Sequence, residues 1–565
     1  MKPISPVVST EVELPVHFDD RFRPLSILPL VAMALGACDF DPAGVATDPD
    51  GAVAAAWERA GELLKGRNGS TSEAKPPNAA PESTTLEPEP APSAGRSDNP
   101  RPDVFLFVVD TLRADSLEPY GAAPGRSPFV AELAARGVTF TRACSTSSWT
   151  VPAMNSIITG LFPREHGVDR GGVGQGGVVG QRVLPERAVT LAERLSAAGY
   201  ATFGICTNQH LHARFGFAQG FDEFVGEGFL KLPFPDLAVD SLAERIRAAD
   251  PAFALLLWFD PHHPYRTNPP WFERWNTSDF ENWNALTLDA ASRIYRIASG
   301  LADDEPIPPA EAVAVHRRAR MMTLLDPRDL INVARESGTG VANRYFEFMR
   351  AAYDSEVARF DESLRRNFER LGAGDDDLVI LTADHGEEFD DHGSIGHRFR
   401  GSLYQELVRV PLIVLLPGRK HAGRVVSAPV SLVDILPTIL EVAGIPTDAA
   451  EHSGTSLLAA ISGDDRGPRV LHGELIEPLA DVRYRLEWPW KYIHDFTRQR
   501  GELYRLDGDP GEQRDLAAAE PRRAARMLAG LLEWMERMPY RWPEMETVPL
   551  SNQEIERLRA MGYLQ

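Results

Sequence analysis

The sequence predicts an α/β fold in which a mostly parallel β-sheet is sandwiched by helices. Three continuous apolar runs have the composition of strands buried on both faces: Val104–Val109, Phe253–Phe259 and Leu378–Leu381. Apolar residues recur at helical spacing over Phe129–Arg136, Leu191–Ala198 and Tyr353–Leu371. Buried strands that alternate with helices are typical of a parallel sheet covered on both faces.

The length, charge and cysteine content of the chain exclude several classes of protein. The chain has 565 residues, and 59 basic against 81 acidic side chains give a net charge of −22. We therefore expect no nucleic-acid partner, and any anionic ligand must be attracted locally. The three cysteines exclude a disulfide scaffold. We expect Cys144 and Cys206 to be buried free thiols, with a disulfide as the alternative.

The first 100 residues have the composition of a targeting segment and a tether. An apolar run over 24–35 is too short to span a membrane and leads into Leu35-Gly36-Ala37-Cys38, which resembles a bacterial lipobox. The alternative is a chance apolar run. We predict a signal peptide over 1–38 and a flexible Pro/Glu/Ser-rich tether over 39–100. A lipid anchor would attach the protein to the membrane of the bacterial cell envelope, where it would face the periplasm or the exterior.

Potential metal ligands follow each predicted strand. In chain order they are Asp110, Asp260, His262, Asp384 and His385. A single aspartate after a strand is usually a helix cap, but the carboxyl ends of parallel strands meet at one edge of a sheet, where ligands bind. Carboxylates and imidazole at that edge predict a site for one divalent cation, Mn²⁺, Zn²⁺, Ca²⁺ or Mg²⁺. In the alternative, Asp260 binds a second metal ion.

Thr150 lies at the predicted start of another helix. Pro152 suits the first helical turn, and the apolar residues from Met154 to Leu161 have helical spacing. Free N–H groups and the dipole at a helix N-terminus favour an anion. Thr150 is therefore either part of an anion site or a simple helix cap.

Short motifs extend from Pro102 to about Leu516. They are Val109–Asp115, Thr150–Pro163, Phe259–Tyr265, Thr382–Glu387, Gly396–His397, Leu403–Glu406, Arg409–Ile413 and Glu502–Tyr504. Their order and spacing resemble those of the sulfatase family, within the alkaline-phosphatase superfamily. The resemblance implies an alkaline-phosphatase-like catalytic domain over 101–465 and a small antiparallel α+β subdomain over 466–565. Short alternating runs at 488–493 and 502–506 predict a hairpin there, with a helix over 521–538.

The resemblance also implies roles for individual residues. The metal ion would lie among Asp110, Thr150, Asp384 and His385, with Thr150 where sulfatases carry the cysteine or serine that becomes formylglycine. His262 and His397 would face the oxygens and leaving group of the ester, and Asn208 and Asp260 would contact the substrate. Two further histidines, His166 and His392, are expected at the surface, and residues 267–338 are long enough for a lid.

Two positions depart from the family pattern. Threonine at 150 cannot become formylglycine, and Met154 replaces the arginine of the modification motif, so no formylglycine is expected. Thr111 replaces the second aspartate of a metal-binding pair. Both departures resemble the phosphate-ester branches of the superfamily, in which an unmodified threonine attacks phosphorus.

These features predict a metal-dependent hydrolase of a small anionic ester. A cation would activate the Thr150 hydroxyl, which is a poor nucleophile when protonated. Phosphate or phosphonate esters fit better than sulfate esters, because threonine lacks the hemiacetal route by which formylglycine releases sulfate. Two alternatives keep the same residues: an envelope phosphoryl transferase and a catalytically inactive binding protein.

Overall fold

The computed structural model describes residues 101–168, 171–173, 179–226, 234–263, 265–276, 306–308, 341–397, 402–464, 467, 469–477, 480–542 and 546–551. The predicted signal peptide and tether lie outside the described residues, as does most of the predicted lid segment. Apart from Pro306 and Ile307, the described residues belong to one compact unit, formed by Gly95–Ser292 and Pro308–Gln565.

A mixed sheet of nine described strands forms the centre of this unit. In spatial order its strands are β12 (Arg424–Val426), β2 (Val138–Cys144), β11 (Arg409–Leu415), β8 (Leu378–Ala383), β1 (Val104–Val109), β7 (Ala252–Trp258), β5 (Ala201–Cys206) and β6 (Glu223–Gly226), and β13 (Val430–Ser431) also pairs with β2. Every pair is parallel except those of β11 with β2 and with β8. The predicted mostly parallel sheet is therefore confirmed.

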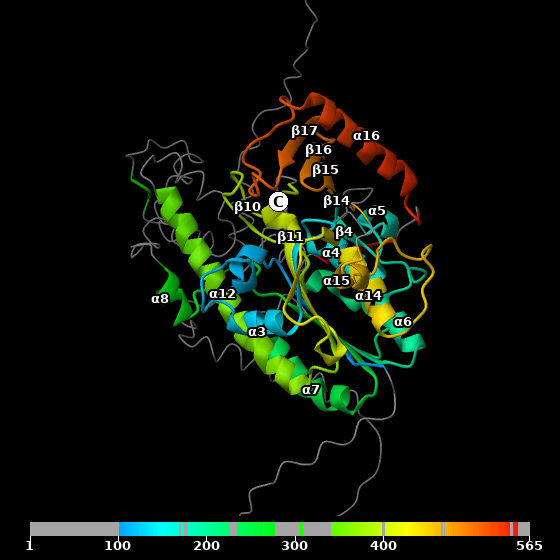
Figure 1. The fold of residues 1–565 in the computed structure, drawn as a ribbon. Coiled ribbons are helices and arrows are strands. Elements are labelled where there is room, and N and C mark those ends of the chain that lie inside the picture. Colours follow the sequence, from blue (N-terminus) through cyan, green and yellow to red (C-terminus); the bar gives the residue numbers. More distant parts are fainter. Residues whose placement is uncertain are drawn as a thin grey trace, which may run out of the picture. The chain divides into compact units, whose positions relative to one another are not determined.

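Helices cover both faces of this sheet (Figure 1). One layer holds α3 (Pro128–Arg136), α7 (Phe234–Ala248) and α12 (Val341–Leu371), which pack together, and α8 (Trp271–Trp275) contacts α12. The other layer holds α4 (Thr150–Thr159), α5 (Pro163–His166), α6 (Leu191–Ala197), α14 (Ile435–Val442) and α15 (Leu458–Ser462). The helix predicted from Tyr353 begins earlier, at Val341.

The central strands are buried along their whole length because they have helices on both sides. All residues of β1, β7 and β8 are buried. Aromatic side chains fill the α12 side of the sheet: the ring of Trp258 lies 5.8 Å from that of Phe107 and 5.5 Å from that of Phe360. This double coverage explains the unbroken apolar runs in the sequence.

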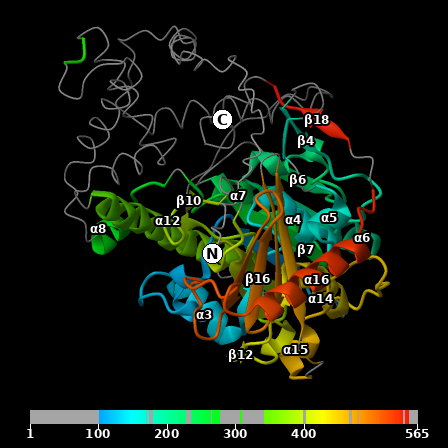
Figure 2. The ribbon, with the colours of Figure 1, turned by 90° about the horizontal axis from the view of Figure 1, so that it is seen from above.

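A second sheet follows in the C-terminal part of the chain (Figure 2). It is antiparallel, in the order β14 (Val470–Glu477), β15 (Ala480–Glu487), β16 (Trp490–Asp495) and β17 (Arg500–Arg505), and α16 (Pro521–Arg537) packs on it. The predicted hairpin and helix are thus confirmed. The Tyr484 hydroxyl donates to the carbonyl of Ser145 at 2.8 Å, which joins this sheet to the end of β2.

The remaining described elements are short. They are β3 (Gly171–Val173), β4 (Val179–Arg182) and β18 (Thr547–Pro549), which form a three-stranded sheet; the β9 (Glu388–Phe389) and β10 (Ile395–Gly396) hairpin; α13 (Gln405–Val408); and the 3₁₀ turns Ala114–Ser116, Glu118–Tyr120, Gln209–Leu211, Ala213–Phe215, Pro417–Arg419 and Leu432–Asp434. Cys144 and Cys206 are buried free thiols, as predicted. No helix within the described ranges has both the length and the apolar character needed to cross a membrane.

Candidate active site

The ends of β1 and β8 bring two of the predicted metal ligands together. Val109 and Ala383 are partners in these parallel strands, so Asp110 and Asp384, which follow them, leave the sheet at the same edge. The amide of Thr111 donates to Asp384 Oδ1 at 3.2 Å and connects the two strand ends.

Thr111 adopts a backbone conformation that is rare for a β-branched residue. Its φ is +57°, in the left-handed region, at a cost of about 1–3 kcal/mol. Two contacts hold it: the amide bond to Asp384, and the Tyr353 hydroxyl, which donates to the Thr111 carbonyl at 2.8 Å. The strained turn points the Thr111 amide at Asp384, so Thr111 supports a candidate ligand through its backbone.

Asp110, Asp384 and His385 form a compact cluster of donor atoms. His385 Nε2 lies 3.8 Å from Asp110 Oδ1 and 3.6 Å from Asp384 Oδ2. One ligand atom from each of the three residues lies within 4.8 Å of the others, and all three side chains are fully buried. The spacing suits a single ion between them.

The protonation of the cluster also suits a cation. His385 Nδ1 lies 2.8 Å from the Gly386 carbonyl, which can only accept, so Nδ1 carries the proton and Nε2 presents a lone pair. Burial lowers the pKa of His385 well below its usual value. Burial and then the charge of Asp384 raise the pKa of Asp110, and burial raises that of Asp384 to about 7. Asp384 Oδ2 accepts no hydrogen bond from the described residues. A divalent cation would remove the cost of burying these charges, so the residues fit one.

Thr150 is the first residue of α4, and its side chain faces the cluster. Its Oγ1 lies 3.4 Å from Asp110 Oδ1 and 3.3 Å from His385 Nε2, and the side chain is fully buried. The hydroxyl makes no cap bond to its own helix in these contacts; instead it contacts two of the candidate ligands. The structure thus brings together all four residues of the predicted metal site.

Asn208 supports this cluster from the end of β5. Its Nδ2 donates to Asp110 Oδ2 at 2.7 Å, while its Oδ1 accepts the amide of His210 at 2.9 Å. The second bond fixes the orientation of the side-chain amide, so the N–H group faces the carboxylate. The contact found for Asn208 is therefore with a candidate ligand, and its role toward substrate stays a prediction.

His397 lies beside the cluster and is oriented by a buried carboxylate. Its ring centroid is 4.5 Å from that of His385. Its Nδ1 lies 2.8 Å from Glu387 Oε1, and the other oxygen of Glu387 accepts the Tyr265 hydroxyl at 2.8 Å. Glu387 therefore fixes the orientation of the His397 ring beside the cluster.

His262 completes this side of the site. Its ring centroid lies 5.0 Å from that of His397 and 4.4 Å from that of Phe259, on which it stacks. Asp260 is fully buried at the end of β7 but is not part of the cluster of close donor atoms. The structure thus places His262 beside His397, and His397 beside the candidate ligand His385, while the substrate role of Asp260 stays a prediction.

Three residues differ from the sequence analysis. Glu387 was not predicted as a site residue, although its place directly after Asp384-His385-Gly386 was the available signal. His166, predicted at the surface, is fully buried, and burial lowers its pKa to about 3. His392, also predicted at the surface, is only partly exposed: its side chain is 12% exposed and lies 2.8 Å from Glu406 Oε1. Distant segments, which local sequence does not reveal, cover both histidines.

The chain is similar in sequence and in fold to known proteins. A sequence model of the family described as Sulfatase matches residues 102–445. Mouse steryl-sulfatase is 26% identical over 442 residues, covering 67% of this chain and 68% of that protein. PehA of Trinickia caryophylli, a multifunctional alkaline phosphatase superfamily protein, is 26% identical over 428 residues, covering 63% and 76%. The phosphonate monoester hydrolase of Agrobacterium radiobacter has a similar fold, with a TM-score of 0.56 and 21% identity over 80% of this chain and all (100%) of that one.

Proposed function

The chain belongs to the sulfatase family of the alkaline-phosphatase superfamily and is an ester-hydrolysing enzyme, and from that premise we propose that Thr150 is its nucleophile. The substrate class we propose is a phosphate or phosphonate ester, with sulfate esters less favoured. The observation that carries the proposal is the position of Thr150 Oγ1, 3.3 Å from His385 Nε2 and 3.4 Å from Asp110 Oδ1.

Attack requires that the Thr150 hydroxyl lose its proton. A divalent cation held by Asp110, Asp384 and His385 would supply charge neutralisation for the ester and lower the pKa of the hydroxyl. The chain itself positions the nucleophile: α4 begins at Thr150, so the hydroxyl is held on a rigid element whose N-terminal dipole favours an anionic ester.

The two histidines act on the other oxygens of the ester. Glu387 accepts from His397 Nδ1 and orients the ring, and His397 would donate a hydrogen bond or a proton to the leaving oxygen. His262, stacked on Phe259 beside His397, offers a second polar group to the oxygens that carry charge in the transition state.

The threonine favours phosphorus over sulfur. A formylglycine hydrate expels sulfate by reverting to the aldehyde, whereas a threonine ester has no such exit and must be hydrolysed by water. Met154 stands where the modification motif has arginine, which is consistent with an unmodified nucleophile. The named activity of the Agrobacterium radiobacter enzyme, phosphonate monoester hydrolysis, supports this choice of substrate.

Substitution of the nucleophile tests the proposal. Wild type, Thr150→Ala and Thr150→Ser should be assayed on 4-nitrophenyl sulfate, phosphate, phosphate diester and phenylphosphonate, each with Mn²⁺, Zn²⁺ and Ca²⁺. We expect Thr150→Ala to lose roughly 10⁴-fold or more in kcat, as removal of a nucleophile does elsewhere, and Thr150→Ser to retain measurable activity. Undiminished turnover by Thr150→Ala would refute the assignment, and a preference for sulfate would refute the choice of substrate.

A further inference from the structure

The β9–β10 hairpin has two residues of the candidate active site at its open end. Within the hairpin Glu388 pairs with Gly396. Glu387 precedes this pair and His397 follows it, with 2.8 Å between Glu387 Oε1 and His397 Nδ1. The position of His397 in the site therefore depends on how the hairpin is held.

The turn of the hairpin is shaped by bonds within it. Glu388 Oε1 accepts the amides of His392 and Ser394, at 3.0 and 2.9 Å. Asp390 adopts a φ of +68°, and its amide donates to the Ser394 carbonyl at 2.7 Å. These bonds set the shape of the turn, and other contacts attach it to the neighbouring segments.

His392 attaches the turn to two such segments. Its Nδ1 lies 2.8 Å from Glu406 Oε1, and its Nε2 lies 3.0 Å from the carbonyl of Glu512, which can only accept. Burial alone would lower the pKa of His392, but the bond and charge of Glu406 outweigh it and raise the pKa to about 9. At neutral pH both ring nitrogens therefore donate, so this side chain joins the turn to α13 and to the segment that follows β17.

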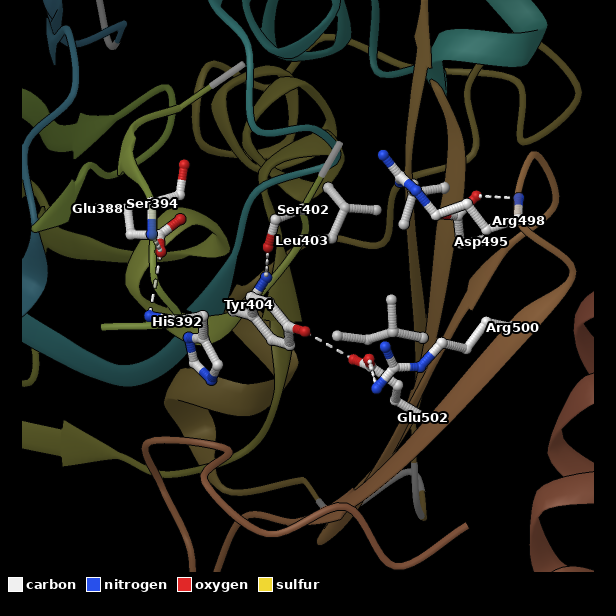
Figure 3. Close-up of a pocket in the computed structure, with 12 residues that line it drawn as sticks. Glu388, His392, Ser394, Ser402, Leu403, Tyr404, Asp495, Arg498, Arg500 and Glu502 are labelled. Carbon is white, nitrogen blue, oxygen red and sulfur yellow. Dashed lines mark hydrogen bonds and ion pairs between the residues drawn. The ribbon is translucent and has the colours of Figure 1, made fainter. Parts of the chain in front are cut away.

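Tyr404 adds a ring contact to the same junction. Its ring stacks on the His392 ring, with 3.7 Å between centroids and 11° between planes. Its hydroxyl donates to Glu502 Oε2 at 2.7 Å, so Figure 3 shows Tyr404 between His392 and Glu502, beside the cavity that all three line. His392 is thus connected to the C-terminal sheet by a second route, through β17.

Glu512 is a fixed point of attachment. Its carboxylate pairs with Lys491 Nζ of β16 at 2.9 Å, and both side chains are fully buried. Its Oε2 accepts the amide of Gln405 at 2.6 Å, and Lys491 Nζ donates to the Leu403 carbonyl at 2.6 Å. A buried ion pair with these additional bonds holds its backbone in place, so the Glu512 carbonyl is a rigid acceptor for His392.

We propose that His392 is a positioning residue for ester hydrolysis: it holds the β9–β10 hairpin against the C-terminal subdomain and thereby holds His397 at the reacting ester. The inference rests on the proposed function, in which His397 acts on the leaving oxygen. A misplacement of about 1 Å caused far from the chemistry can cost about a hundredfold in rate. The effect of His392 should therefore appear in kcat and not in substrate binding.

Substitutions that keep or remove single bonds test the proposal. In His392→Asn the side-chain amide can replace Nδ1 at Glu406 but does not reach the Glu512 carbonyl, whereas in His392→Gln it can reach that carbonyl. With the best 4-nitrophenyl ester, we expect His392→Asn to lower kcat by roughly ten- to a hundredfold and to change KM by less than about twofold. His392→Gln should retain more activity.

Tyr404→Phe is a milder variant, because it removes only the hydroxyl that is bonded to Glu502. It should lower kcat by a smaller factor, and it carries the test if the His392 variants do not fold. An unchanged kcat in His392→Asn would overturn the positioning role, as would an unchanged kcat in Tyr404→Phe where the His392 variants do not fold.

His472→Asn is the matched control. His472 is another buried histidine stacked on an aromatic ring, that of Trp534, with 4.4 Å between centroids. Its Nε2 lies 3.2 Å from Arg485 Nη1 of the neighbouring strand, so both partners belong to the C-terminal subdomain. The kcat of His472→Asn should stay at the wild-type value.

A double-mutant cycle shows whether His392 acts through His397. In a chain that already carries His397→Ala, His392→Asn should lower kcat no further, because the group that it positions is gone. A loss in this background as large as the loss in wild type would mean that the two residues act independently, and it would overturn the proposal.

A measurement without substrate separates this proposal from the proposed function. If the chain hydrolyses no ester, or if His397→Ala leaves hydrolysis undiminished, NMR spectra of protein labelled at its histidine nitrogens still decide. The Nδ1 resonance of His397, assigned with His397→Gln, reports the bond to Glu387. We expect His392→Asn to shift this resonance and His472→Asn to leave it in place, and an unshifted resonance in His392→Asn would overturn the positioning role.

Discussion

Replacing Asp384 by asparagine should stabilise the metal-free protein and weaken its response to cations. Asp384 Oδ1 accepts the amides of Thr111 and His385 at 3.2 and 2.8 Å, and an asparagine oxygen can keep both bonds. The other oxygen faces His385 Nε2 at 3.6 Å, where an amide group carries no charge. The substitution therefore removes a buried charge next to Asp110 while keeping the shape of the side chain.

The size of the effect follows from the pKa of Asp384. Burial raises this pKa from 3.8 to about 7 in the metal-free protein. At roughly 1.4 kcal/mol per pH unit, the difference corresponds to about 4 kcal/mol. Because the folded state holds a proton that the unfolded state releases, the free energy of unfolding falls as pH rises from about 4 to about 7 and then levels off. Asparagine should remove this dependence.

Unfolding in urea, followed by tryptophan fluorescence with EDTA or with Mn²⁺, measures the effect between about pH 5 and about pH 8. Asp361→Asn is the control, because Asp361 is another buried carboxylate that accepts two amides, those of Phe129 and Val130, at 3.0 and 2.8 Å. That variant should respond to Mn²⁺ as wild type does. Two results would refute this prediction. One is that Asp384→Asn is less stable than wild type in EDTA at about pH 8; the other is that Mn²⁺ raises its free energy of unfolding as much as it raises that of wild type.

Three further predictions concern residues outside the cluster. Lys491→Met should lower the free energy of unfolding in urea by about 3–5 kcal/mol, because it leaves the fully buried Glu512 without its partner at 2.9 Å; no loss would contradict this. Glu406→Gln should move the NMR titration midpoint of His392 below that of wild type, because the bond and charge of Glu406 raise the pKa of His392 to about 9. The variant should also lose the stability that wild type has below about pH 6.5 and loses as pH rises through about 9; an unmoved midpoint would count against this prediction. Cys144, whose pKa burial raises to about 11, should escape iodoacetamide in the folded protein and react only in denaturant, as peptide mass spectrometry can determine.

Local sequence patterns were sufficient to predict the strands and the site residues that follow them. The runs before Asp110 and Asp384 are apolar without interruption because helices cover both faces of the sheet. Since parallel strands end at one edge, side chains that follow different strands were expected to meet, and Asp110, Asp384 and His385 do meet. Thr150 was placed at a helix start by Pro152, and α4 begins there.

Such local patterns could not predict contacts between distant segments. Glu387 orients His397 only because the β9–β10 hairpin folds Gly396 back opposite Glu388. His166 was expected at the surface, yet it is fully buried beside α4, with its Nε2 3.2 Å from the Pro152 carbonyl. The residues next to either histidine do not specify these partners, because the local sequence around a polar side chain does not show whether solvent or another segment surrounds it.

The sequence by itself determined the class of fold, the family and the types of residue at the site, because strand periodicity and motif spacing are local properties of the chain. Only the tertiary structure determined which donor atoms lie close together. The register of β1 against β8 brings Asp110 close to Asp384, and the strained turn at Thr111 points an amide at the Asp384 carboxylate. The tertiary structure alone also joined Tyr404 to Glu502, which come from segments far apart in the sequence. Distances between such segments depend on how the whole sheet packs, and no stretch of sequence encodes them.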